Sequence, residues 1–489
     1  RYEKPPLPSW ITALFGFIFG LENVATLRLP TMLMGIFLGY MGYLFSLKII
    51  DSKLQALINA LILLSSFYII VITVEAPWDI YTHGFMLTGI YFLYSFFNLA
   101  GDKWKNSLLA GLFIGLSFMS KGPVSLYALL LPFLLAYGFV YKYKGFGVDR
   151  KFIPLAVMIL MAMIIGIWWF LYVRLADPNA FLAITKKETA NWSSYNVRPF
   201  YYYWSFFVQS GVWTIPALMS LMYPYLKNKV SDKKAYRLTF LWTIFSVILL
   251  SIIPEKKARY LVPVLIPLAL NTGFYLEYVI NHFRSTLTPK EKIPVYFHFS
   301  LIGLIGIAYP FIGFFILKDG LNGLWGYYAL SSLALFAIGV LLFVQLKKQQ
   351  LFGCFLLTIA LVAAIKLLAM PLSGAMEKNA QYKSISQLRQ DMQEEGLKTY
   401  CFGEIAPEMI WDYGSAIPVL KGEEEIIIPN GEKFAVLVIP SDENEFKRIF
   451  DPEYSYTINT VYDLNYNADP GTKGHKNRLI SNLYIVQKR

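Results

Sequence analysis

The sequence has few charged residues and almost no cysteine. Of its 489 residues, 16% are charged and two are cysteine, whereas 56% are apolar and the mean hydropathy is +0.47. An average soluble protein carries about 25% charged residues. The composition therefore excludes a disordered chain and a disulfide-stapled fold, and it indicates an integral membrane protein.

The sequence also lacks the motifs of several enzyme classes. It has no Walker loop, no GxGxxG after a strand and no GxSxG elbow, so ATP-driven and hydrolase chemistry has no support. The four histidines, His83, His282, His298 and His475, have neither the spacing of a metal site nor a shared helix face. We therefore predict no cofactor and no metal site, and a divalent metal stays an open alternative.

Long apolar runs are abundant. A spanning helix needs about 20 predominantly apolar residues, and the chain contains about twelve candidates. They run near 31–47, 54–74, 80–99, 107–119, 124–141, 153–173, 202–226, 236–253, 260–280, 295–317, 324–345 and 351–370. Residues 8–20 predict a half-length helix in the membrane interface. The predicted fold class is an α-helical polytopic membrane protein.

Lysine and arginine gather in alternate loops. The loops near 48–53, 103–105, 142–151, 227–237, 284–292 and 347–348 hold most of the excess positive charge, which is +12 in all. These loops are expected to be cytoplasmic, so 1–30, 75–79, 174–201, 254–259, 318–323 and everything after 370 should face the periplasm of a bacterium. The distribution of positive charge therefore indicates how the chain is oriented in the inner membrane. It does not indicate a binding face for nucleic acid, so we predict no nucleic acid partner.

Residues 371–489 change character. Apolar runs shorten to strand length at Thr399–Phe402, Ile426–Ile428, Ala435–Ile439 and Asn482–Val486, and helices are predicted near 377–395 and 443–450. We therefore expect a juxtamembrane motif loop with an interfacial helix (1–30), a transmembrane domain (31–370) and a soluble extracytoplasmic α/β domain (371–489).

Polar residues cluster at five places on the predicted outer side. They are Tyr2-Glu3-Lys4, Asp79 after Pro77, Lys121 before Gly122-Pro123, Glu188 and Arg198 in the loop 174–203, and Lys256, Lys257, Arg259 and Tyr260. Four of these have ordinary alternatives, namely a juxtamembrane loop, a helix cap, a snorkelling lysine and an aromatic belt. The last is an exception to the positive-inside rule, and three cations there favour an anionic ligand such as phosphate.

These motifs, in their order along the chain, resemble those of the polytopic GT-C glycosyltransferases of the lipid A aminoarabinose transferase and protein O-mannosyltransferase type. The matching stretches are Tyr2–Leu7, Arg28-Leu29-Pro30, Asp79, Lys121-Gly122-Pro123, Trp168-Trp169 with the loop of Glu188, and Lys257–Pro263. The resemblance covers most of 1–280. It implies inverting transfer of a sugar from a polyprenyl-phosphate carrier to a hydroxyl or phosphate of lipid A, another envelope glycolipid or a secreted protein, at the periplasmic membrane face.

The resemblance also implies roles for individual residues. In such families Lys4 would contact the carrier phosphate, and Tyr260 with a nearby cation would complete the cradle. The substrate-binding candidates are Tyr2, Lys4, Lys121, Glu188, Arg198, Lys256, Lys257, Arg259 and Tyr260, and the catalytic candidates are Asp79 and Glu3. The family's principal acid follows a first span and would lie upstream of Arg1, so we expect thirteen spans in the complete protein.

Two features separate the chain from the family pattern and keep other functions open. The family's principal acid is not among the residues of this sequence, and the residue after Glu188 differs. Glu188 is followed by Thr189, where the aminoarabinose branch commonly has histidine, and this argues against a metal site built on Glu3. The alternatives are a non-catalytic membrane partner subunit of an envelope complex and a transporter of lipid-linked sugar. The expected partners are the carrier-linked donor, a lipid or protein acceptor and membrane lipids.

Overall fold

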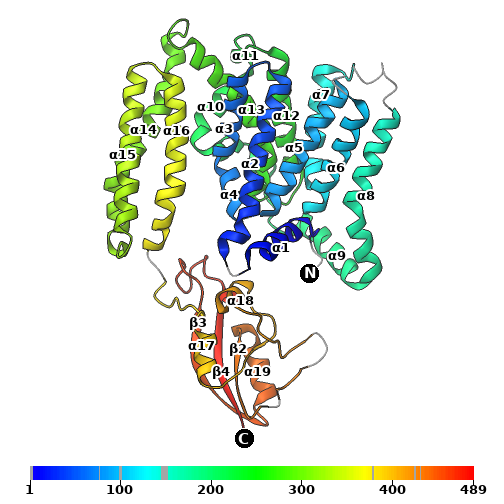
Figure 1. Cartoon of the computed structure of the whole chain (residues 1–489), viewed down its shortest axis with the longest axis vertical. Coiled ribbons are helices and arrows are strands. Elements are labelled where there is room, and N and C mark those ends of the chain that lie inside the picture. The colour runs from blue at the N-terminus through cyan, green and yellow to red at the C-terminus, as the bar shows by residue number, and fades with distance from the viewer. Residues whose placement is uncertain are drawn as a thin grey trace. The chain divides into compact units, whose positions relative to one another are not determined.

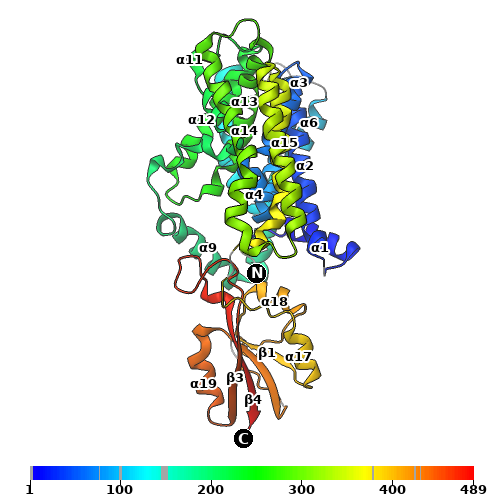
Figure 2. The ribbon, with the colours of Figure 1, turned by 90° about the vertical axis from the view of Figure 1, so that its left-hand side faces the viewer.

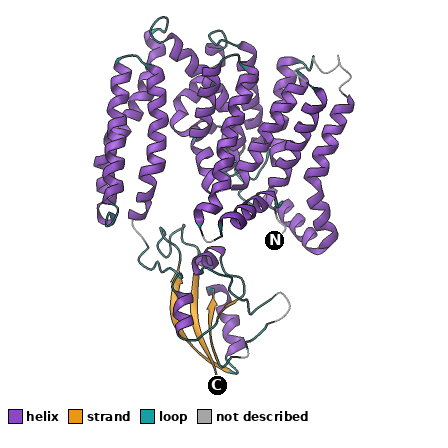
Figure 3. Cartoon of the chain, in the orientation of Figure 1, coloured by secondary structure: helices purple, strands orange, loops and turns teal. Residues whose placement is uncertain are grey.

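The computed structural model describes residues 4–21, 23–75, 77–98, 102–144, 152–376, 379–422, 426–429 and 431–489. The chain divides into two compact units, one formed by Arg1–Pro310 with Leu330–Leu367 and the other by Phe311–Ala329 with Leu368–Arg489. The first unit is helical, and the strands of the described residues all lie in the second (Figure 3).

Sixteen helices, α1 to α16, follow one another through the first unit, with the end of α14 and the start of α15 reaching into the second (Figure 1). They are α1 (Leu7–Phe19), α2 (Val24–Ile49), α3 (Lys53–Ser65), α4 (Phe67–Glu75), α5 (Pro77–Phe97), α6 (Lys103–Lys121), α7 (Leu131–Tyr141), α8 (Phe152–Ala176), α9 (Pro178–Ser194), α10 (Thr214–Ser220), α11 (Tyr223–Leu226), α12 (Lys233–Ile252), α13 (Val262–His282), α14 (Pro289–Leu317), α15 (Trp325–Lys347) and α16 (Leu351–Ala364). The predicted interfacial helix at 8–20 corresponds to α1.

Local sequence signals set many of the helix starts. An Asn, Ser or Asp side chain accepts a hydrogen bond from a backbone N–H of the first turn and so caps the helix. These capping residues are Asn23, Ser52, Asp102, Asp177 and Asp232. These five helices, α2, α3, α6, α9 and α12, therefore begin where a polar residue ends the preceding loop.

The predicted count of about twelve spans is not confirmed. Seven helices in the described part of the chain are long and apolar enough to cross a membrane, and the pair α3 and α4, bent by 54°, would make an eighth. Residues 202–226 form four short helices instead of one span, and the chain kinks at Gly211, where φ is +68°. The predicted span 124–141 is a π-helical turn at Leu126–Leu130 followed by the 11-residue α7.

Helix α13 lies in the interior of the first unit. Nearly all of its residues from Val262 to Val279 are buried, and it packs against α3, α10 and α12. In contrast, α8, α14 and α15 expose apolar side chains such as Ile164, Leu304 and Leu333. Because water would penalise so much exposed apolar surface, these faces are suited to contact with lipid.

The second unit contains a four-stranded sheet with helices on both faces (Figure 2). The strands β1 (Thr399–Phe402), β2 (Lys433–Val438), β3 (Tyr454–Asp463) and β4 (Ile480–Lys488) lie in the order β1-β2-β4-β3, with β1 parallel to β2 and the other pairs antiparallel. Ala435 and Leu437 pack with α17 (Leu388–Glu394) and α18 (Pro407–Tyr413), whereas the alternate β2 residues pack with α19 (Glu443–Phe450). Because both faces of β2 are covered, the strand is apolar from Phe434 to Val438.

Several predictions for this unit are wrong in detail. The helix predicted over 377–395 is only α17, and residues 377–378 lie outside the described residues. Ile426 makes a single bridge to Lys421, so 426–428 is not a strand. Strand β3 was not predicted, because its polar and exposed middle at an edge of the sheet gives no apolar run.

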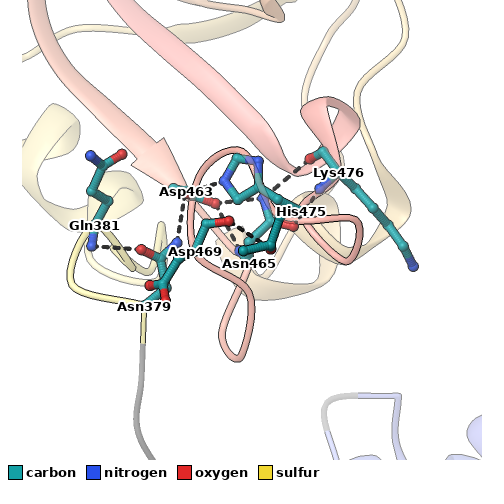
Figure 4. Close-up of polar contacts among 8 residues, drawn as sticks. Asn379, Gln381, Asp463, Asn465, Asp469, His475 and Lys476 are labelled. Carbon is teal, nitrogen blue, oxygen red and sulfur yellow. Dashed lines mark hydrogen bonds and ion pairs between the residues drawn. The ribbon is translucent and has the colours of Figure 1, made fainter.

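A buried carboxylate closes the end of β3 (Figure 4). Asp463 Oδ1 accepts hydrogen bonds from Asn465 N at 2.8 Å and Asn465 Nδ2 at 2.7 Å, and Oδ2 lies 3.0 Å from Asn379 Nδ2 and 3.1 Å from His475 Nε2. Burial raises the pKa of Asp463, but these hydrogen bonds outweigh it and hold the pKa below its ordinary value. The network fastens the segment at Asn379 and the loop of His475 to the sheet, so its role is structural.

Candidate functional site

The centre of the candidate site is an ion pair between Asp79 and Lys121. Asp79 lies in the first turn of α5, and Lys121 lies in the last turn of α6, just before Gly122, whose φ of +82° ends the helix. Lys121 Nζ donates a hydrogen bond to Asp79 Oδ1, and the two side chains are 14% and 6% exposed. An acid at a helix start and a cation at a helix end also interact favourably with the helix dipoles.

The ring of Tyr260 lies between two lysines. Its centroid is 5.6 Å from Lys121 Nζ and 5.4 Å from Lys257 Nζ, which is within the range of a cation–π contact. Glu255 binds the same group, since its Oε1 lies 2.9 Å from Lys257 Nζ and accepts a hydrogen bond from the Tyr260 hydroxyl at 3.1 Å. Burial lowers the pKa of Lys257, but the contacts with Glu255 and Tyr260 outweigh it and raise the pKa above its ordinary value.

Two further cations lie near this centre. Lys4 Nζ is 3.3 Å from Glu188 Oε1 on α9, and both side chains are more than 40% exposed. Lys4 and Arg259 both interact electrostatically with Lys121. Within the described residues Arg259 forms no ion pair of its own.

The segment 254–260 is held in place by the loop at 195–203. The N–H of Arg198 donates to Pro254 O at 3.2 Å, and the N–H of Lys256 donates to Asn196 O at 3.1 Å. The Tyr203 hydroxyl accepts from Lys257 N and donates to Lys257 O, both at 3.0 Å. The site therefore has a fixed wall made of two loops that lie far apart in the sequence.

Not every predicted residue joins this group. Lys256 is 3% exposed, and its Nζ donates to the carbonyl oxygens of Ile253 and Arg198 instead of facing Tyr260. Arg198 contributes its backbone to the wall. Tyr2 and Glu3 lie outside the described residues.

Comparison with known proteins gives the chain a family context. Residues 3–170 match the family described as dolichyl-phosphate-mannose-protein mannosyltransferase. An undecaprenyl phosphate-alpha-4-amino-4-deoxy-L-arabinose arabinosyl transferase of Wigglesworthia glossinidia brevipalpis is 26% identical over 299 residues, which are 60% of this chain and 51% of that protein. The resemblance to GT-C glycosyltransferases of this type is confirmed.

The chain is also similar to two other proteins. An uncharacterized protein of Aquifex aeolicus is 27% identical over 314 residues, 63% of this chain and 58% of that protein. The chain thus spans little more than half the length of the curated relatives it matches. Its fold is similar to that of ArnT from Cupriavidus metallidurans, which was solved in complex with undecaprenyl phosphate. The TM-score is 0.65, with 14% identity over 99% of this chain and 88% of that one.

The structure adds two residues to the candidate site that the sequence did not single out. Glu255 binds Lys257 and Tyr260, and the ring of Tyr195 lies 4.6 Å from Lys257 Nζ. Glu255 could have been found from the sequence, because it directly precedes the cations of 256–259, and an acid next to several cations suggests an ion pair. The signal for Tyr195 was absent, because only the folded loop brings it there.

The site contains four cations and three carboxylates. Each of its lysines has a carboxylate partner, and the pairs are Lys4 with Glu188, Lys121 with Asp79 and Lys257 with Glu255. Among the residues that the structure describes, no three His, Cys, Asp or Glu side chains gather in a way that could hold a metal ion. The arrangement is suited to an anion that competes with the carboxylates for the cations.

Proposed function

We propose that the chain is an inverting GT-C glycosyltransferase that moves a sugar from a polyprenyl-phosphate carrier to a hydroxyl or phosphate acceptor. The observation that carries this proposal is a group of four cations next to the buried Asp79. Lys121 and Lys257 approach the ring of Tyr260, and Lys4 and Arg259 interact electrostatically with Lys121. The acceptors we consider are lipid A, another envelope glycolipid and a secreted protein. The relatives named as undecaprenyl phosphate-alpha-4-amino-4-deoxy-L-arabinose arabinosyl transferases support a sugar donor linked to a polyprenyl phosphate.

The reaction makes a definite demand on the site. As the acceptor oxygen forms its bond to the anomeric carbon, the bond from that carbon to the carrier phosphate breaks, and the phosphate gains negative charge. Clustered cations lower the energy of this step by stabilising that charge. Arg259, Lys4 and the Tyr260 hydroxyl would bind the phosphate, whereas Lys256 faces the other way and would only hold the loop.

A carboxylate has to take the acceptor's proton and support positive charge on the sugar. In this proposal Asp79 supports the charge on the sugar and holds Lys121 in place, with Glu3 as a second candidate.

We further propose that the site faces the periplasm across a bacterial inner membrane, with the domain 371–489 on the same side. The alternation of basic loops along the chain supports this orientation. The lipid-linked donor and the envelope acceptor would meet at the periplasmic face of the membrane.

Binding of undecaprenyl phosphate to the purified chain tests the proposal directly. A charge-assisted hydrogen bond contributes about 1.5–3 kcal/mol, so Lys4→Ala and Arg259→Ala should each weaken binding by about tenfold or more. Lys227→Ala is the matched control, because Lys227 follows α11 at the opposite end of the helical unit (Figure 1). The proposal would be refuted by an unchanged affinity for undecaprenyl phosphate in both test variants. It would also be refuted by an equal loss of affinity in the control.

A further inference from the structure

Polar groups continue from the Asp79–Lys121 pair into the helical unit. His83 follows Asp79 by four residues on α5 and so lies one turn along the same helix face. On α6, Ser117 precedes Lys121 by four residues, and its hydroxyl donates to Thr82 O at 2.7 Å. The ion pair is therefore backed by a second layer of polar side chains.

His83 is unusual within this layer. It is 2% exposed, and its Nδ1 has no hydrogen-bond partner in the part of the chain that the structure describes. An enclosed polar atom without a partner costs about 1–3 kcal/mol, and native structures keep few of them. His83 interacts electrostatically with both Asp79 and Lys121. An ionisable group that is buried in a membrane domain next to a charged partner points to function.

A second buried histidine, His298, serves as a comparison, because its neighbours are aromatic side chains. His298 on α14 is 3% exposed, and its Nε2 also lacks a partner among the described residues. Its neighbours are the rings of Trp213 and Phe299, with centroids 5.9 and 4.7 Å away. Burial is therefore common to both histidines, whereas proximity to a carboxylate distinguishes His83.

We propose that His83 is a positioning residue for Asp79. This inference rests on the proposed function, because it concerns what happens when a carrier phosphate enters. The phosphate would draw Lys121 towards itself, and Asp79 would lose its donor. The ring N–H of His83 then donates to the carboxylate, which keeps it ionised and oriented towards the sugar.

The decisive experiment measures kcat and KM with undecaprenyl phosphate-linked 4-amino-4-deoxy-L-arabinose as donor and lipid A as acceptor. His83→Leu should lower kcat at least tenfold and leave the donor KM within twofold, whereas His298→Leu should leave kcat within twofold. The amide nitrogens of His83→Gln and His83→Asn approximate Nε2 and Nδ1, so one of the two should recover most of kcat. The variant that recovers identifies the ring nitrogen that acts.

Three kinetic results would overturn the inference. They are a kcat within twofold of wild type in His83→Leu, equal damage in His298→Leu, and a kcat in both amide variants as low as that in His83→Leu. Any of these would leave His83 as a packing residue. If His83→Leu does not fold, the two amide variants decide the matter.

A second readout separates this inference from the proposed function. The proposed hydrogen bond forms when the carrier phosphate is present, so a double-mutant cycle with Asp79→Asn is measured with undecaprenyl phosphate added. The shifts in melting temperature of the two single variants should then not add, since the two side chains interact. Additive shifts would overturn the positioning role whatever the activity. A wild-type chain that neither binds undecaprenyl phosphate nor transfers sugar would refute the proposed function, while non-additive shifts would still support the contact.

Discussion

Replacing Glu188 with Gln should tighten the binding of a carrier phosphate. In the structure Glu188 neutralises Lys4, the lysine that the family resemblance assigns to the phosphate. A carboxylate at this place competes with a phosphate for the same cation and also repels it. The sequence suggested Glu188 as a substrate-binding residue, but its contact with Lys4 favours the role of an exchangeable partner.

The size of the effect follows from the exposure of the pair. The two side chains are 43% and 42% exposed, with 3.3 Å between Lys4 Nζ and Glu188 Oε1. Exposed ion pairs contribute about 0.2–1 kcal/mol, so freeing Lys4 should lower the Kd for undecaprenyl phosphate by about 1.4- to 5-fold. The gain should fade in about 1 M salt, where charges are screened within about 3 Å.

Titration of the detergent-purified chain with undecaprenyl phosphate at two salt concentrations would measure this. Glu445→Gln is a matched control, because it breaks a similarly exposed pair with Lys421 on another part of the chain. In a Lys4→Ala background, Glu188→Gln should bring little further gain. Weaker binding by Glu188→Gln at low salt would refute the reasoning and make Glu188 a group that the ligand needs.

Two further predictions concern single carboxylates. Asp79→Asn should lower the initial rate of sugar transfer while the affinity for undecaprenyl phosphate stays near wild type. The reason is that Asn keeps an oxygen for Lys121 but cannot support positive charge on the sugar. A wild-type rate would leave Asp79 only the role of a residue that starts a helix. The second unit should lose stability in acid, because the lowered pKa of Asp463 gives stability above about pH 4 that is lost as the pH falls through the folded-state value. The melting temperature of the full chain, measured between pH 7 and 3, should show this loss, and Asp463→Asn should make the melting temperature less dependent on pH. An equally steep dependence on pH in that variant would contradict the prediction.

The sequence predicted some elements of the fold to the residue. Strand Thr399–Phe402 and helix Glu443–Phe450 are found with those bounds, because each combines an apolar pattern of the right period with a polar or proline boundary. Span counting was less successful, since hydropathy records how apolar a stretch is but not where the backbone kinks, as at Gly211. Polar edge strands such as Tyr454–Asp463 are specified by their neighbours and leave little local signal.

The site shows the same division between local and tertiary information. The sequence grouped Lys256 with Lys257 because the two cations are adjacent. The backbone at Lys257 is extended, however, and successive side chains of an extended segment point in opposite directions. Lys257 therefore faces Tyr260, while Lys256 turns to the carbonyls at the end of α12.

The pairing of the site's cations with carboxylates has a consequence for binding. Unpaired charges held close together would repel one another, and Glu188, Asp79 and Glu255 remove that cost. Each pair must be loosened when a phosphate binds, so part of the phosphate's attraction is offset. The offset is smallest at the exposed pair of Lys4 and is absent at Arg259, which forms no ion pair in the described structure. These two cations should therefore make the first contact with an anionic headgroup, and the buried pair of Lys121 should respond only once the headgroup is in place.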